Sequence, residues 1–194
     1  FIGSISASGG LVMGSKAATT GTEASVAGGC CNTASGGCST VAGGRSNTAS
    51  VSGTFIGGGT CNAAAGCCST ITGGFSSYNT GAFTTVAGGC ENLVYGGCSV
   101  VGGGSCNKNF CNLTTVAGGC CNVGCGTNSV VGGGSCNVTT GVCSTIAGGF
   151  SGCSIGKFGT VAGGSCNAAC GNCSTVAGGT ANRACGHNSF IGGG

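Results

Sequence analysis

The feature that most constrains this chain is a strict period of fifteen residues. Valine or isoleucine recurs at every fifteenth position without insertion, and a Gly-Gly pair always follows two and three residues later. These aliphatic residues are Val26, Val41, Ile56, Ile71, Val86, Val101, Val116, Val131, Ile146, Val161, Val176 and Ile191. We number each coil from this residue as position 0, so that the glycines occupy positions +2 and +3. A chain with such a repeat folds by stacking one small unit on the next.

Within each coil the alternation of side-chain types has a period of two, which is typical of β-strands. One half of the coil reads Asn-x-Ala-x-Gly and the other reads Ser-x-Val-x-Gly. Two short strands and two turns in each repeat predict an all-β fold, a parallel β-solenoid or β-roll with 15-residue coils and about 13 coils in all. Residues 1–25 follow the pattern loosely and predict atypical capping coils, whereas residues 26–194 predict a single domain of regular repeats.

The composition fits a narrow coil, because 48 of the 194 residues are glycine. Alternation directs positions 0, +2, +6, +8 and +13 inward, and glycine at +3 is expected to have a positive φ. Position +6 predicts an inward asparagine ladder, in which each side-chain amide bonds the same residue one coil away. Its members are Asn32, Asn47, Asn62, Asn92, Asn107, Asn122, Asn137, Asn167 and Asn182.

The titratable residues leave little room for acid–base catalysis. The chain has no aspartate, two glutamates and one histidine, His187. We therefore expect no enzymatic activity, no catalytic residues, no bound metal and no cofactor. Five scattered Lys and Arg residues form no basic patch for nucleic acid. No apolar stretch of about 18 residues exists, so no membrane insertion is expected.

The segment from Asn32 to Gly44 reads Asn-Thr-Ala-Ser-Gly followed, after Gly-Cys, by Ser-Thr-Val-Ala-Gly-Gly. It resembles the head repeats of trimeric autotransporter adhesins and the related repeats of phage and viral tail fibres. It is also similar to the grass-type ice-binding β-roll. The resemblance extends over residues 12–194 and implies a left-handed coil.

Two outward positions, +14 and +1, change together. Threonine at +14 usually accompanies alanine at +1, whereas each bulky residue at +14 accompanies glycine at +1. Constant summed volume indicates a packed face between chains or sheets; the alternative is a local contact of the large side chain with its own glycine. The proposed face contains Thr40, Phe55, Gly57, Thr85, Val100, Gly102, Thr115, Val130, Gly132, Thr145, Thr160, Thr175, Phe190 and Gly192.

The two turn corners, at +4/+5 and +12, also change together: cysteine accompanies cysteine, phenylalanine accompanies phenylalanine, and Lys16 accompanies Glu23. The paired corners are Cys31 with Cys38, Cys61 with Cys68, Cys90 with Cys98, Cys136 with Cys143, Cys166 with Cys173, Phe75 with Phe83, and Phe150 with Phe158. Within one coil about 15 Å of strand separates the two corners, beyond the Cα separation of about 7 Å that a disulfide spans. We therefore expect contacts between chains, in a parallel homotrimer with interchain disulfides.

Twenty cysteines indicate an oxidising location, which is extracellular, at the cell surface or at the virion surface; the alternative is small thiols packed in a reduced protein. The expected function is a structural or adhesive segment of a fibre that self-associates as a homotrimer, with a cell-surface receptor or glycan as a further partner. One alternative is an ice-binding solenoid that uses the threonine column at +14. A second alternative is an open self-assembling filament, because a solenoid end exposes unpaired backbone groups.

Overall fold

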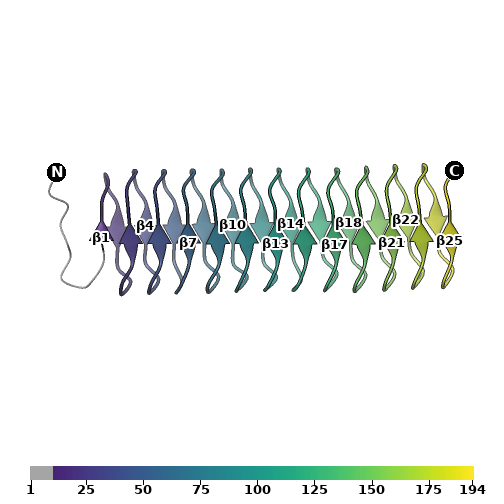
Figure 1. Ribbon diagram of the computed structural model, residues 1–194, viewed down its shortest axis with the longest axis horizontal. Helices are drawn as coiled ribbons and strands as arrows, with labels where there is room; N and C mark the ends of the chain where they lie inside the picture. Colours follow the sequence, from purple (N-terminus) through teal and green to yellow (C-terminus); the bar gives the residue numbers. More distant parts are fainter. Residues whose placement is uncertain (1–10) are drawn as a thin grey trace. The chain divides into compact units, whose positions relative to one another are not determined.

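The computed structural model describes residues 11–194, which form two compact units. The first unit ends at Val94 and the second spans Tyr95–Gly194. The described residues contain 25 strands of two residues each and no helix. In each unit the chain runs alternately through two parallel sheets, with turns at both edges of the stack (Figure 1).

In the first unit, the odd-numbered strands form one sheet and the even-numbered strands form the other. The odd strands are β1 (Leu11–Val12), β3 (Ser25–Val26), β5 (Thr40–Val41), β7 (Phe55–Ile56), β9 (Thr70–Ile71) and β11 (Thr85–Val86). The even strands are β2 (Ala18–Thr19), β4 (Thr33–Ala34), β6 (Thr48–Ala49), β8 (Ala63–Ala64), β10 (Tyr78–Asn79) and β12 (Leu93–Val94).

The second unit repeats this arrangement. Its odd strands are β13 (Val100–Val101), β15 (Thr115–Val116), β17 (Val130–Val131), β19 (Thr145–Ile146), β21 (Thr160–Val161), β23 (Thr175–Val176) and β25 (Phe190–Ile191). Its even strands are β14 (Lys108–Asn109), β16 (Val123–Gly124), β18 (Val138–Thr139), β20 (Cys153–Ser154), β22 (Ala168–Ala169) and β24 (Arg183–Ala184).

The strand register confirms a parallel β-solenoid with coils of 15 residues, in about 12 turns. Val41 pairs with Ile56, and Val116 pairs with Val131. The first described coil is one residue shorter, because Val12 pairs with Val26. Its turn has the single Gly14 where later coils have Gly-Gly, so the turn is one residue shorter and the strands keep their register. The expected capping coils at residues 1–25 lie partly outside the described residues.

A column of aliphatic side chains fills the interior of each unit. Val41 and Ile56 in the first unit and Val131 and Ile146 in the second have no exposed area. Alanine, serine, threonine and asparagine occupy most of the remaining inward positions, because two sheets this close together leave little room; Val94, in the same coil as Val86, is the exception. Positions 0, +6, +8 and +13 are inward as predicted, but glycine at +2 is not: Gly43 and Gly118 are only half-buried, with open space where a Cβ would lie.

The buried asparagines join successive coils through the backbone. Asn47 Nδ2 donates to the carbonyls of Gly43 (3.0 Å) and Gly59 (2.9 Å), and its Oδ1 accepts the backbone N–H of Asn62 at 3.0 Å. Asn62 Nδ2 also lies 3.2 Å from Asn47 Oδ1, but the bonds that repeat from coil to coil run to the backbone. The same set recurs at Asn32, Asn122, Asn137 and Asn167. The bond from each side chain to the same residue one coil away thus runs mainly to the backbone N–H of that residue, while the amide Nδ2 donates to turn carbonyls.

Glycine at +3 has the expected positive φ. Gly44 has a φ of 84° and Gly119 has a φ of 89°. A Cβ added to Gly119 would lie 2.1 Å from the carbonyl oxygen of Gly134 in the next coil. Both the backbone conformation and the close stacking of coils therefore require glycine at this position.

Candidate functional site: turn corners and outward faces

The turn corners are built on residues in the left-handed backbone conformation. Cys31 at +5 has a φ of 59° and Cys38 at +12 has a φ of 52°. Cysteine rarely adopts this conformation, so the residue type at Cys31 and Cys38 did not indicate it. Gly53 and Asn128 at +12 did indicate it, because glycine and asparagine favour a positive φ. The two turns lie at opposite ends of each coil, and one chain does not bring +5 and +12 together.

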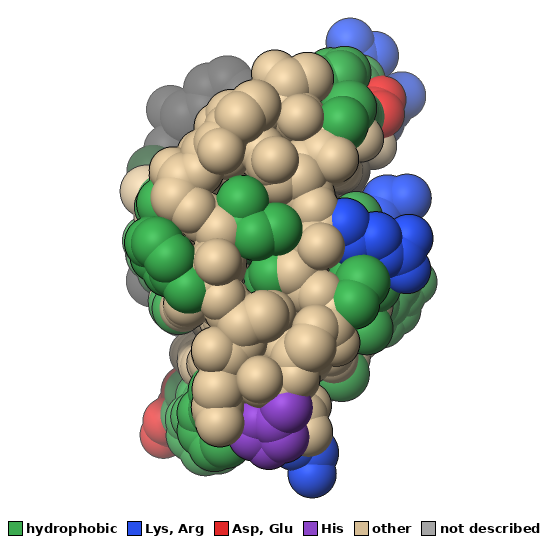
Figure 2. Space-filling view, turned by 90° about the vertical axis from the view of Figure 1, so that its right-hand side faces the viewer, with side chains coloured by type: hydrophobic (Ala, Val, Ile, Leu, Met, Phe, Trp, Pro, Cys, Tyr) green, Lys and Arg blue, Asp and Glu red, His purple; other side chains and the backbone are tan. Residues whose placement is uncertain are grey.

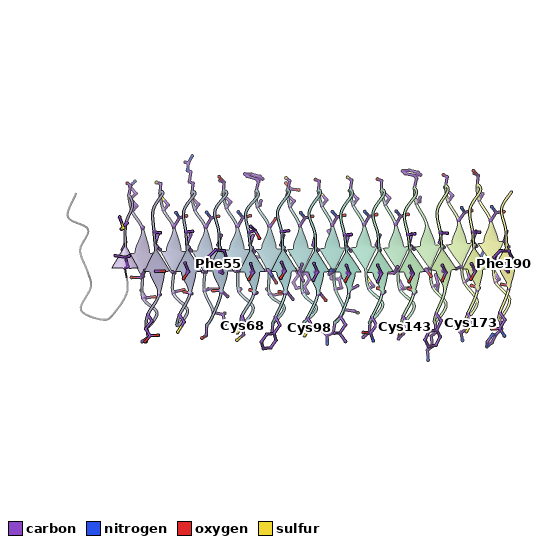
Figure 3. All side chains as sticks on the ribbon, in the orientation of Figure 1. Phe55, Cys68, Cys98, Cys143, Cys173 and Phe190 are labelled. Carbon is purple, nitrogen blue, oxygen red and sulfur yellow. The ribbon has the colours of Figure 1, made fainter. Side chains whose placement is uncertain are left out.

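The corner thiols are accessible. All twenty cysteines are free and each is exposed or half-buried. Figure 3 shows Cys98, Cys143 and Cys173 in the turns along one edge of the second unit. The expected disulfides between chains stay a prediction, and the structure contains none within the chain.

Three pairs of cysteines adjacent in sequence bring their sulfurs into contact. Their Sγ–Sγ distances are 3.2 Å for Cys30 and Cys31, 3.5 Å for Cys67 and Cys68, and 3.4 Å for Cys120 and Cys121. The expected site residues included neither Cys67 nor Cys120, although adjacency in the sequence was the signal for both.

The surroundings of these thiols favour their protonated form. The pKa of Cys31 is raised by its hydrogen bond with Cys30 and by desolvation. Hydrogen bonds with Cys67 and with Cys120 likewise raise the pKa values of Cys68 and Cys121. Within a hydrogen-bonded pair, one thiol therefore donates to the sulfur of the other at neutral pH.

Glu23 contacts a cysteine of the same corner in the next coil. The Cys38 Sγ donates to Glu23 Oε2 at 3.4 Å, and this hydrogen bond raises the pKa of Cys38. Successive +12 residues are thus neighbours along one edge of the first unit. The expected pairing of Glu23 with Lys16 of another copy stays a prediction.

The corner phenylalanines face solvent. Phe75 and Phe83 are 50% and 65% exposed at the two ends of one coil of the first unit. Phe150 and Phe158 are 54% and 58% exposed at the two ends of a coil of the second unit. Each unit therefore has one coil with an uncovered aromatic ring at both ends, which is costly in water unless a partner covers it.

At the outward +14 and +1 positions, the structure shows the local contact that was the alternative to packing between chains. A Cβ on Gly57 would lie 3.4 Å from Phe55 Cε1 and 2.4 Å from the carbonyl oxygen of Thr72. A Cβ on Gly192 would lie 3.6 Å from Phe190 Cε1. The carbonyl oxygen of the next coil thus requires glycine at Gly57, whereas the ring of Phe190 leaves room for a Cβ at Gly192. Packing of this face against another copy stays a proposal.

The threonines of the same face stand in register on neighbouring strands. Thr145, Thr160 and Thr175 pair consecutively on β19, β21 and β23 and are half-buried. Neighbouring strands place such side chains about 4.8 Å apart. Val100 and Val130, each 39% exposed, interrupt the column in the second unit.

The outward face of the even strands has one aromatic stack. Tyr95 and Phe110 lie with ring centroids 5.6 Å apart and an angle of 12° between their planes. Both are more than 40% exposed. Figure 2 shows backbone and small polar groups over most of the visible surface, with hydrophobic side chains in separate patches and few charges.

Other site types find no support in residues 11–194. No group of three or more His, Cys, Asp or Glu residues there has the arrangement to hold a metal ion. No helix of this part of the chain has the length and hydropathy that a membrane crossing needs.

A family model described as ubiquitous surface protein adhesin repeat matches residues 174–186, a segment that includes β23 and β24. No curated protein matches the chain. The short match and the solenoid are consistent with an adhesin-like repeat and with a structural or adhesive repeat protein. They suggest a surface location and a non-enzymatic role.

Proposed function

We propose that this chain is a structural or adhesive segment of an extracellular or virion fibre, and that it assembles as a parallel homotrimer. The observation that carries the proposal is the exposure of matched residues at both ends of the same coils. Phe75 and Phe83 share a coil, as do Cys61 and Cys68, and all four are exposed. Uncovered rings and thiols at matched heights are suited to contacts between parallel copies.

Parallel alignment gives each corner a partner at its own level. In a ring of three copies, the +5 end of one coil meets the +12 end of the same coil in the neighbouring copy. Cysteine then meets cysteine and phenylalanine meets phenylalanine, and a surface location favours disulfide formation. Because the corner contacts repeat along the stack, their modest individual contributions to the free energy of association add up to a stable trimer.

The adhesive role rests on the outward side chains that vary between coils. The stacked rings of Tyr95 and Phe110 give a flat apolar surface of the kind that contacts a receptor or the faces of sugar rings. The adhesin-repeat match at residues 174–186 supports this role for the chain.

The test is the mass of the native protein by light scattering, followed by electrophoresis with and without reductant. We expect a trimer in solution, a trimer band without reductant and a monomer band with it. The corner variant replaces the +12 cysteines by serine at Cys38, Cys68, Cys98, Cys143 and Cys173. It should lose the covalent trimer.

The matched control replaces four cysteines on the outward face of the even strands by serine: Cys125, Cys153, Cys170 and Cys185. This variant should keep the covalent trimer, because none of these residues is at a turn corner. A native monomer with twenty free thiols in non-reducing buffer would overturn the proposal.

Ice binding is the second candidate, favoured by the in-register threonines of β19, β21 and β23. It is weaker because Phe55, Val100, Val130 and Phe190 interrupt a column that an ice lattice would need to be flat. Thermal hysteresis at micromolar protein, together with a monomeric mass, would favour this candidate over the fibre.

A further inference from the structure

We propose that the three adjacent cysteine pairs, in their reduced form, are chelating sites for trivalent arsenicals. The pairs are Cys30–Cys31, Cys67–Cys68 and Cys120–Cys121, with sulfurs 3.2–3.5 Å apart. We refer to them as the vicinal thiol pairs. This proposal does not depend on trimer formation.

The turn backbone brings the two sulfurs of each pair together. Cys31, Cys68 and Cys121 have φ values of 59°, 52° and 57°. In extended backbone, neighbouring side chains point to opposite faces and their sulfurs would be apart. The left-handed residue at the corner removes this alternation, so both thiols project on the same side of the turn. Little ordering of the pair is needed when one atom binds both sulfurs.

A pair of thiols suits a ligand atom that forms only two bonds to sulfur. No cluster of three or more potential metal ligands lies among residues 11–194. A trivalent arsenical, R–As=O, reacts with two thiols to form two As–S bonds. Its oxygen leaves as water with both thiol protons, and no oxidation occurs.

Access to the pairs is open. Cys67, Cys68, Cys120 and Cys121 are exposed, while the Cys30 pair is half-buried. The pairs lie at turns on the surface, and their backbone groups bond to the neighbouring coils independently of the thiols. Bound arsenic therefore adds a short bridge at the surface without displacing the interior.

The experiment uses the full chain after reduction with a phosphine and removal of the reductant without oxygen. Phenylarsine oxide is added in excess, and adducts are counted by intact-mass spectrometry in native buffer. The site variant carries Cys31→Ser, Cys68→Ser and Cys121→Ser. It should bind three fewer arsenicals than the unaltered protein. Serine already occupies the +5 corner of Cys31 and Cys121 at Ser46 and Ser76, and the +12 corner of Cys68 accepts asparagine at Asn128, so this variant is expected to fold.

The matched control carries Cys61→Ser, Cys98→Ser and Cys166→Ser. These residues occupy the same +5 and +12 corners with similar φ values, but no cysteine is adjacent to them in sequence. The control should bind as many arsenicals as the unaltered protein. Equal adduct numbers in the site variant and the unaltered protein, or an equal loss in the two variants, would overturn the proposal.

A competition distinguishes chelation from attachment to single thiols. Adducts at the vicinal thiol pairs should withstand a hundredfold excess of the monothiol glutathione and dissociate in the dithiol dithiothreitol. Peptide mapping should place the resistant adducts on the three pairs. Removal of these adducts by glutathione would contradict chelation. A native monomer in the mass experiment would leave this result unaffected, so the two proposals fail separately.

Discussion

At the scale of single residues, backbone conformation decides where side-chain chemistry can be placed. The Gly-Gly turn needs glycine at +3 because a backbone oxygen of the next coil occupies the space of a Cβ. The residues at the +5 and +12 corners also have a positive φ, but their side chains point to solvent, so these positions accept cysteine, serine and phenylalanine. Functional variety is therefore confined to positions where stacking does not restrict volume.

The two glycines of one turn give a direct prediction. Gly119→Ala should lower the free energy of unfolding by about 3 kcal/mol, since the added Cβ meets the Gly134 oxygen at 2.1 Å and φ is 89°. Gly118→Ala is the control, because no atom lies within 4 Å of its added Cβ. It should change stability by less than about 0.5 kcal/mol. Urea unfolding followed by circular dichroism measures both, and equal effects would contradict the steric explanation.

At the scale of strands and turns, the buried asparagine of a coil connects the turn of its own coil to the turn of the next coil. Asn62 joins the carbonyls of Gly58 and Gly74 and accepts a backbone N–H from Ser77. Ser77 itself occupies the asparagine position, and its buried hydroxyl has no hydrogen-bond partner. Gly152 occupies the same position in the second unit.

Two of the three described coils without asparagine have phenylalanine at both corners; the third is the first coil, which has Ala17 at this position. Phe75 precedes Ser77, and Phe150 precedes Gly152. The φ of the glycine at +3 is slightly larger in the two phenylalanine coils than in the other regular coils: it is 103° at Gly74, compared with 84° at Gly59. The loss of the amide and the uncovered rings thus occur in the same coil. We read these coils as specialised for contact at some cost in internal bonding.

Restoring the amide should stabilise the first unit. In Ser77→Asn, the new Nδ2 can donate to the carbonyls of Gly73 and Gly89, the positions that Gly58 and Gly74 hold for Asn62. We expect a gain of about 1 kcal/mol in the free energy of unfolding. Ser76→Asn is the control, since Ser76 is an exposed left-handed corner, and it should be neutral. A destabilised Ser77→Asn protein would show that the ring-bearing coil has no room for the amide.

The sequence predicted the interior well and the turns poorly, for physical reasons. Val41 and Asn47 were assigned inward because strand alternation is local and repeats in every coil. The pattern did not predict that Asn47 also bonds two turn carbonyls, because the competition between a neighbouring amide and a turn carbonyl depends on distances that a pattern does not encode. The left-handed conformation of Cys31 escaped prediction, since cysteine has no preference for it. The contact of Phe55 with Gly57 was foreseen as an alternative but could not be chosen without coordinates.

At the scale of the whole molecule, stability in a solenoid is close to a sum over coils and their neighbours. Successive coils within the second unit bond to each other, as Thr115 does through the carbonyl of Ser129. Coils can therefore be gained or lost as complete units. Length is adjustable only in steps that keep every inward side chain inward, because a one-residue slip in a strand exchanges its two faces.

Removal of one coil from the second unit tests this rule. Deleting residues 116–130 joins Thr115 to Val131 and keeps the sequence of positions, so the fold should persist with a small fall in melting temperature. Deleting residues 116–129 joins Thr115 to Val130 and leaves one extra residue within a strand. Turns absorb such a change, as Gly14 shows, but a strand must bulge or reverse its faces. We expect this shorter deletion to lower the melting temperature by at least about 10 °C more than the deletion of a full coil, because reversing buried valines destabilises by several kcal/mol. Thermal unfolding by circular dichroism gives the comparison. Equal melting temperatures would mean that the coils tolerate slippage, and that matched heights between parallel copies could not be maintained by the fold alone.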